Sequence, residues 1–441
     1  MRASMADFAA LVRRLVTGTA RAWWVLLPQL MILQLLQWLV TELSFRFASL
    51  VIDISGWLAL GVFGLSILIV LAMVVLQMRL VSNHVGGRRL IPADLRLVQA
   101  RVHDDEFGRF LGLTILPFLC IYGAFGEIDR RMQRLSQESV AIQDVLAGVT
   151  LTQQFSIDPL WPKGAFLLLV LLVLFAVRRS LEFANESTTF RGFGYLAAFA
   201  ECMFMLLIIM ILRELYSTTE MSFRGTRMAA WVEAVGEWIV SHMAPVASLI
   251  DMVASGMTII WPLVSVVLLL PALWFALAGL VHGSKVISLA DLWQAGVSPK
   301  MAVRALVRRQ APVDAGGSRT VRHVVLTVQE LLFGDLDDKY IPAAQAVRLA
   351  FRGGALFLAA LSVLHTLLHL LGEEILPWLM VRLLGGHVYD FWFRFAPMFV
   401  DLPVELLIEP VRITLLSVAF AECLRRVRDV SENVRNQEAT A

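Results

Sequence analysis

Residues 57–78 read WLALGVFGLSILIVLAMVVLQM, an apolar stretch of 22 residues without a charged side chain. A helix of about 20 mostly apolar residues crosses the hydrocarbon core of a bilayer, because a helix bonds its backbone polar groups internally. This stretch therefore predicts a membrane-spanning helix. Seven other stretches are similar, and the eight predicted spans are 22–41, 57–78, 110–126, 164–177, 193–212, 258–281, 353–372 and 404–424.

The composition of the whole chain agrees with these stretches. Of its 441 residues, 58% are hydrophobic and 17% are charged, whereas soluble proteins have about 25% charged residues. The formal net charge of +2 excludes a strongly basic protein that binds nucleic acid by bulk charge. We therefore expect an all-α integral membrane protein, whose first partner is the lipid bilayer.

The distribution of basic residues predicts the orientation in the membrane. Most of the 38 lysines and arginines fall in loops on the same side as the N-terminus. Because cytoplasmic loops are enriched in basic residues, and because the number of spans is even, both termini are expected in the cytoplasm. The strong excess of arginine over lysine indicates a GC-rich bacterial genome, so the expected location is the inner (cytoplasmic) membrane.

Short motifs recur in the same order in the two halves of the chain. The hexapeptide TELSFR at 41–46 recurs as TEMSFR at 219–224. The tripeptide IPA at 91–93 recurs unchanged at 341–343. The order predicts two four-helix repeats, 1–189 and 190–441, that insert the same way round. The alternative is that similar helix ends coincide by chance.

Two segments of the second repeat have no counterpart in the first. Residues 225–250 contain Trp231 and Trp238 with few charges, which is typical of a helix in the outer interface. Residues 283–340 form a predicted cytoplasmic insertion with two amphipathic runs. Such faces outside the bilayer bind other proteins or return to the membrane surface, so further membrane or cytoplasmic subunits are expected as partners.

Polar side chains gather in the seventh predicted span. His365, His369 and Glu373 follow one another at a spacing of four residues, which places them on one face of a helix. Two imidazoles with carboxylates can bind a divalent metal ion such as zinc, can pass protons, or can hydrogen-bond to their neighbours at the interface. The sequence leaves all three interpretations open.

The eighth predicted span is also unusually polar. It contains Glu405, Glu409 and Arg412, whereas the corresponding span of the first repeat, 164–177, has no polar side chain. Charged residues in a span normally face the bundle interior or a water-filled cavity. Glu409 can pair with Arg412 three residues later, or the guanidinium can bind an anionic substrate. We therefore predict a polar site between the seventh and eighth spans.

Glu201 is a single acidic residue in the fifth predicted span and is a candidate proton carrier. The fourth predicted span is short, so it is expected to continue into Arg178 and Arg179, whose long stems can reach the interface.

Common catalytic motifs are absent from the sequence: it has no Walker A loop, no GxSxG elbow and no HExxH pair. No catalytic residue is therefore predicted, and an enzyme is the least favoured function. A transport or translocation component is favoured by the polar site and the repeats. A non-catalytic scaffold subunit of a larger membrane complex is the second interpretation, and a lipid-modifying membrane enzyme is the third.

Overall fold

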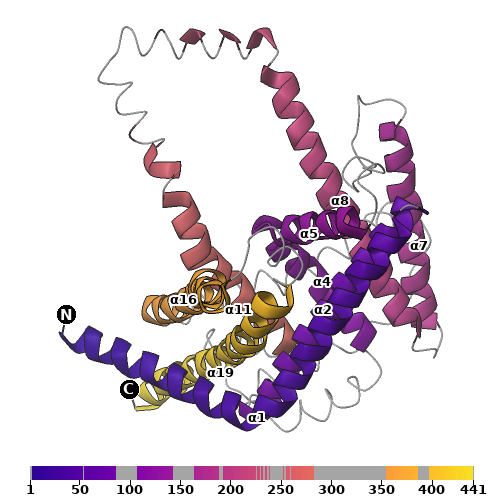
Figure 1. Ribbon diagram of the computed structural model, residues 1–441. Helices are drawn as coiled ribbons and strands as arrows, with labels where there is room; N and C mark the ends of the chain where they lie inside the picture. The colour runs from indigo at the N-terminus through magenta and orange to yellow at the C-terminus, as the bar shows by residue number, and fades with distance from the viewer. Residues whose placement is uncertain are drawn as a thin grey trace, which may run out of the picture. The chain divides into compact units, whose positions relative to one another are not determined.

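The computed structural model of the chain describes residues 2–52, 54–85, 107–142, 163–187, 192–224, 354–385 and 397–440, residues 255–282 apart from residue 259, and a few positions between 226 and 252. Every regular element in these residues is a helix, as Figure 1 shows. The elements are α1 Arg2–Val51, α2 Gly56–Val85, α4 Phe107–Ala124, α5 Glu127–Ile142, α7 Lys163–Ser187, α8 Gly192–Arg224, η2 Ser265–Leu269, α11 Leu270–His282, α16 Ala355–Leu370, η4 Leu371–Ile375, α17 Leu376–Leu384, η6 Pro397–Asp401 and α19 Leu402–Thr440.

Among the described residues, five helices are long and apolar enough to cross a membrane. They contain the first, second, fifth and sixth predicted spans, and the seventh, 353–372, except for its first two residues. They are Met5–Val51, Gly56–Val85, Gly192–Leu212, Ser255–Val281 and Ala355–Leu384. The described part of the chain is thus all-helical, with several helices suited to a bilayer. The fourth and eighth predicted spans lie within α7 and α19, and the third, 110–126, lies in α4 except for its last two residues. The total of eight spans stays a prediction.

Large apolar side chains on the surface of α1 agree with a lipid environment. Trp24, Ile32 and Leu43 each leave more than half of their surface exposed. In water such a continuous apolar surface favours association, whereas hydrocarbon chains solvate it without cost. The first predicted span therefore has an outer face suited to lipid.

Helix α1 is much longer than the predicted span inside it. Its 50 residues correspond to about 75 Å along the helix axis, whereas the hydrocarbon core is about 30 Å thick. The prediction 22–41 ended where polar residues begin, but arginine and glutamate are good helix formers and continue the backbone hydrogen bonding. Hydropathy thus marks the part of the helix suited to lipid, not the helix ends.

The helices group into two compact units. Unit 1 comprises Met1–Thr41, Ile69–Phe118 and Pro271–Ala441, and unit 2 comprises Glu42–Leu68 and Leu119–Leu270. Each unit combines segments from both predicted halves, 1–189 and 190–441. This division by contacts does not test an internal duplication, so the two four-helix repeats stay a prediction.

The core of unit 1 joins three of its helices through aromatic rings. Phe275 of α11 lies with its ring centroid 5.6 Å from those of Phe357 of α16 and Phe420 of α19. Helix α19 also lies beside the N-terminal part of α1 (Figure 1), where Gly18 leaves room for the side chain of Val418. These contacts fix α16 and α19 as neighbours.

Unit 2 is built around the packing of α7 against α8 and of α2 against α8. Gly64 lets these last two helices approach closely, because a Cβ atom there would lie 2.5 Å from the Met203 sulfur. The thiol of Cys202 donates a hydrogen bond to the Gly64 carbonyl at 3.4 Å. Small residues are common at such crossings in membranes, because they bring backbones together.

Two short π-helical turns flank the predicted polar site of unit 1. Turn η4 lies between α16 and α17 and departs from α-helical hydrogen bonding there, and turn η6 directly precedes α19. Gly372 of η4 packs against Ile408 of α19, since a Cβ atom there would lie 3.2 Å from its side chain. Such turns occur frequently at functional sites.

Several predicted segments fall outside this description. The cytoplasmic insertion 283–340 lies outside the described residues, as does most of the interfacial segment 225–250.

Candidate functional site in the helix pair α16 and α19

A stripe of polar side chains lies along the facing parts of α16 and α19 in unit 1. The contact between Gly372 and Ile408 brings the end of α16 beside the start of α19, so the two helices run antiparallel and later residues of one face earlier residues of the other. We call this set the α16–α19 polar stripe; its members are Ser362, His365, Thr366, Glu409, Arg412 and Ser417.

His365 is the most enclosed member of the stripe. Its exposed fraction is 0%, and neither ring nitrogen has a hydrogen-bond partner in the part of the chain that the structure describes. It lies within electrostatic range of Arg412 and His369. An imidazole has at least one N–H donor and, when neutral, one acceptor nitrogen. Both are available to a solute or to water.

Arg412 forms the ion pair that its spacing predicts. Its Nη2 donates a hydrogen bond to Glu409 Oε1 at 2.5 Å, and the side chains are 12% and 25% exposed. The guanidinium also lies over the ring of Trp274 in α11, 6.0 Å from the centroid. The buried Nε of Arg412 has no hydrogen-bond partner among the described residues. One part of the guanidinium is thus held by Glu409, whereas the buried Nε is left without a hydrogen bond.

The hydroxyl groups of the stripe are also buried without hydrogen-bond partners among the described residues. The oxygens of Ser362, Thr366 and Ser417 are buried, and each lacks a partner within the described ranges. Leaving a buried polar group unpaired costs about 1–3 kcal/mol, and hydrocarbon offers no compensation. Because so many unpaired groups share one helix pair, the arrangement is suited to holding water or a polar solute.

The remaining predicted residues lie at one end of the stripe. Glu405 precedes Glu409 on α19 and is half-buried, and His369 is half-buried one turn after His365. Glu373 lies on η4 and is exposed. The predicted site therefore corresponds to one helix pair, with its acidic residues toward one end.

The predicted metal site over His365, His369 and Glu373 receives no support from this geometry. No group of three or more histidine, cysteine or acidic side chains in the described residues is arranged to hold a metal ion. His365 and His369 lie on α16, whereas Glu373 lies on the π-helical turn η4. The metal site stays a prediction from the sequence alone.

Glu201 has a partner that the sequence did not indicate. Its Oε2 lies 2.6 Å from Nε of Arg178 in α7, and the side chains are only 2% and 8% exposed. The guanidinium also lies over the ring of Phe204, 5.7 Å from the centroid. Arg178 is thus buried in unit 2 and faces a carboxylate. Glu201 remains the single acidic residue of its predicted span, and its role as a proton carrier stays a prediction.

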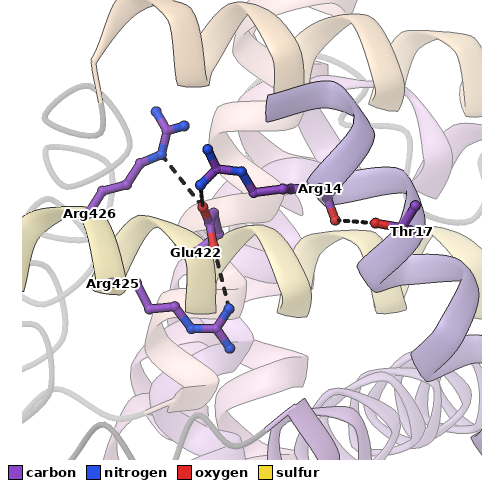
Figure 2. A network of polar contacts seen from close by, with 5 residues as sticks. All are labelled: Arg14, Thr17, Glu422, Arg425 and Arg426. Carbon is purple, nitrogen blue, oxygen red and sulfur yellow. Dashed lines mark hydrogen bonds and ion pairs between the residues drawn. The ribbon is translucent and has the colours of Figure 1, made fainter. Parts of the chain in front are cut away.

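A second polar network lies where α1 packs against α19, and Figure 2 shows its residues. Glu422 accepts hydrogen bonds from Arg14 and Arg425, both at 3.4 Å, and lies 3.8 Å from Arg426. The spacing of Glu422 to Arg425 and Arg426 on one helix was visible in the sequence. The contact with Arg14 was not, because it joins opposite ends of the chain.

A third network in unit 2 surrounds Glu42, which the sequence did not single out. Arg46 pairs with it at 3.1 Å from one helical turn away, and Arg134 of α5 pairs with it at 2.5 Å. The Arg134 guanidinium also lies over the Phe45 ring. Only the spacing of Glu42 to Arg46 is a signal in the sequence. This network fastens α5 to the end of α1.

No protein-family model, no curated protein and no solved structure matches the chain. The function must therefore be argued from the residues themselves.

Proposed function

We propose that the chain is a multi-pass protein of a bacterial inner membrane and acts as a transport or translocation component. Its solute passes the α16–α19 polar stripe. The observation that carries this proposal is the burial of His365 with both ring nitrogens unpaired in the described residues. A solely structural histidine in a span is expected to be hydrogen-bonded, since hydrocarbon cannot solvate it.

The features around the stripe support the same function. Arg412 and Glu409 place opposite charges inside a helix pair, and intramembrane charges commonly mark solute or proton pathways. The π-helical turn η4 interrupts the helix between α16 and α17, and the π-helical turn η6 stands at the start of α19. Interrupted helices free backbone groups for a ligand and are a recurring element of transporter sites.

The expected topology completes the proposal. Both termini lie in the cytoplasm, eight helices cross the membrane, and two parallel four-helix repeats are related by an axis along the membrane normal. The stripe then belongs to the second repeat. The outer interfacial helix at 225–250 and the cytoplasmic insertion at 283–340 are the places where other subunits bind.

Transport can be tested before the solute is known. Purified protein is reconstituted into liposomes loaded with a metabolite extract, and the solutes that leave are identified by mass spectrometry. At least one solute leaves liposomes that contain the wild type and is retained by liposomes with Arg412→Gln. Equal retention of every solute in both preparations contradicts the proposal. If other subunits also co-purify in fixed ratio, the scaffold function is favoured instead.

A matched control separates the stripe from general damage. Arg425 stands three residues after Glu422, as Arg412 stands three residues after Glu409, and both pairs are on α19. Because Glu422 keeps Arg14 and Arg426 when Arg425 is removed, Arg425→Gln preserves an ion pair and leaves the stripe intact. Its efflux equals that of the wild type.

A further inference from the structure

We infer that Arg14 and Arg426 of unit 1 together bind the headgroup phosphate of an anionic phospholipid, whose acyl chains lie along the exposed apolar surface of α1. Both arginines belong to the Glu422 network, which consists of Arg14, Glu422, Arg425 and Arg426 (Figure 2). This lipid site is distinct from the α16–α19 polar stripe, so the inference goes beyond the proposed transport function.

The Glu422 network carries an excess of positive charge. Three guanidinium groups share one carboxylate, so three positive charges and one negative charge leave a net charge of +2. The carboxylate lies 3.4 Å from Arg14 and from Arg425, and 3.8 Å from Arg426. Charge-assisted hydrogen bonds of arginine are normally about 2.7–2.9 Å long and often come in parallel pairs. Glu422 therefore neutralises at most one of the three cations, and the remaining charge attracts a further anion.

Arg14 and Arg426 share one oxygen of the carboxylate. Nη1 of Arg14 and Nε of Arg426 both approach Oε1 of Glu422, whereas Nη1 of Arg425 donates to Oε2. Figure 2 shows Arg14 and Arg426 on one side of the carboxylate and Arg425 on the other. The side chains of Arg14 and Arg426 are 64% and 32% exposed, and that of Glu422 is 11% exposed. An anion can therefore reach both arginines from outside while Glu422 stays inside.

The exposed apolar surface of α1 distinguishes a phospholipid from a soluble anion. Val25 follows Arg14 by three helical turns, so both lie on one face, about 16 Å apart along the axis. Val25 is 54% exposed, and its neighbour Trp24 is 73% exposed. Arg21 lies between them on this face, is exposed, and can donate to the ester carbonyls of the same lipid. The order of donors and apolar surface along α1 thus matches the order of phosphate, ester and acyl chain.

The site stands at the boundary of the predicted hydrocarbon region. Glu422 lies in the last turn of the predicted span 404–424, and Arg14 precedes the predicted span 22–41. Because these two residues are in contact, this end of both helices meets the lipid headgroups. Basic side chains at that level attract anionic lipids, and pockets of them between helices bind individual headgroups. With the proposed topology, the bound lipid belongs to the cytoplasmic leaflet.

A phosphate bound by both arginines also joins α1 to α19. Arg14 and Arg426 approach the same carboxylate oxygen, and two like charges side by side repel each other. A phosphate between them offers each guanidinium a pair of oxygens, which is the geometry that arginine binds best. Because this bound state needs α1 beside α19, the lipid is expected to stabilise the folded protein and to raise its melting temperature.

The test measures lipid binding by the purified full-length protein in a non-ionic detergent. Phosphatidylglycerol is the anionic probe, and phosphatidylcholine with the same acyl chains is the zwitterionic control. Inorganic phosphate separates a lipid headgroup from a free anion. Native mass spectrometry gives the bound fraction over a lipid titration, and thermal unfolding gives the stabilisation. The ionic strength is kept at about 0.15 M, where charges more than about 8 Å apart are largely screened.

The wild type is expected to bind phosphatidylglycerol more tightly than phosphatidylcholine and to melt at a higher temperature with it. Arg14→Gln and Arg426→Gln each weaken the binding of phosphatidylglycerol by about fivefold, and the double variant weakens it by about 25-fold. Arg425→Gln is the matched control, because it removes the same charge from the far side of Glu422. It changes the affinity by about twofold or less.

Two further variants guard against general damage. Glu422→Gln removes the anion that competes with the phosphate, so it binds phosphatidylglycerol more tightly than the wild type, and misfolding does not produce such a gain. Arg14→Lys with Arg426→Lys keeps both charges without the planar donor fork. This double variant binds more tightly than the double glutamine variant and more weakly than the wild type.

Three results overturn the inference. Phosphatidylglycerol and phosphatidylcholine bind the wild type equally, Arg425→Gln weakens binding as much as Arg14→Gln and Arg426→Gln, or inorganic phosphate binds as tightly as phosphatidylglycerol. The second result shows attraction by bulk charge, and the third shows a site for a free anion. Failure of the proposed function is distinguishable from these results, since lipid binding is measured without transport. The lipid site stands if no solute leaves the liposomes, and transport stands if no anionic lipid binds.

Discussion

Removing Glu201 is expected to destabilise the protein strongly, because it leaves Arg178 charged and buried. The two side chains are 2% and 8% exposed and lie 2.6 Å apart. Breaking such a pair by removing one partner typically costs about 3–5 kcal/mol. We therefore expect Glu201→Ala to lower the free energy of unfolding by about 3–5 kcal/mol. Arg178→Ala is expected to cost a similar amount, and about 0.5–2 kcal/mol more because the contact with Phe204 is lost.

The double variant Arg178→Met with Glu201→Leu tests whether the loss of stability comes from removing only one charge of a buried pair. Replacing both members of a buried pair by apolar residues is often neutral, so the double variant loses less stability than either alanine variant. Denaturant titration of purified protein in one detergent measures all variants. The control is Glu127→Ala: Glu127 and Arg131 pair at 2.9 Å but are 28% and 15% exposed, so about 1 kcal/mol or less is lost. If Glu201→Ala and Glu127→Ala lose equal stability, the reasoning is refuted.

Two other substitutions test the packing of unit 1. Gly18→Leu is expected to lower the melting temperature by several degrees, because even a Cβ atom there lies 3.0 Å from the Val418 side chain. The control is Gly61→Leu, which is expected to leave the melting temperature unchanged because a Cβ atom there meets no atom within 4 Å. Gln77→Leu is expected to cost about 0.6–1.7 kcal/mol in denaturant titration, since it removes the buried hydrogen bond of 3.1 Å that Gln77 donates to Gln34. A stabilised Gln77→Leu protein contradicts that second expectation.

The fold was predictable where it depends on apolar length. The stretch 57–78 lies wholly inside α2, because nothing else in a bilayer satisfies the backbone of such a sequence. The ends of helices were not predictable in the same way. Helix α1 continues from Arg2 to Val51 around the predicted span 22–41, since helix propensity and hydropathy are separate properties.

The polar contacts divide according to their distance along the chain. The pair of Glu409 with Arg412 follows from helix geometry at a spacing of three residues, and it is present. The pair of Arg178 with Glu201 depends on the packing of α7 against α8, which no local pattern encodes. One charged residue in a span predicts that a partner exists but not which residue it is.

The enclosure of His365 illustrates the same limit. The spacing of His365 and His369 predicts that both lie on one helical face, and no local pattern distinguishes their burial. The structure buries His365 completely and leaves His369 half-buried, so the two histidines have different surroundings.

The most direct test of the central claim asks whether water reaches the α16–α19 polar stripe. In a protein without native cysteines, Thr366→Cys and its neighbour Leu367→Cys are exposed in membranes to a charged, water-soluble thiosulfonate. Such reagents need the thiolate, which forms in water and not in hydrocarbon. Leu367 is 50% exposed on the apolar surface of α16, whereas Thr366 belongs to the stripe and its oxygen is buried. We predict that Thr366→Cys reacts and Leu367→Cys does not; the opposite order, or no reaction at Thr366→Cys, contradicts the account.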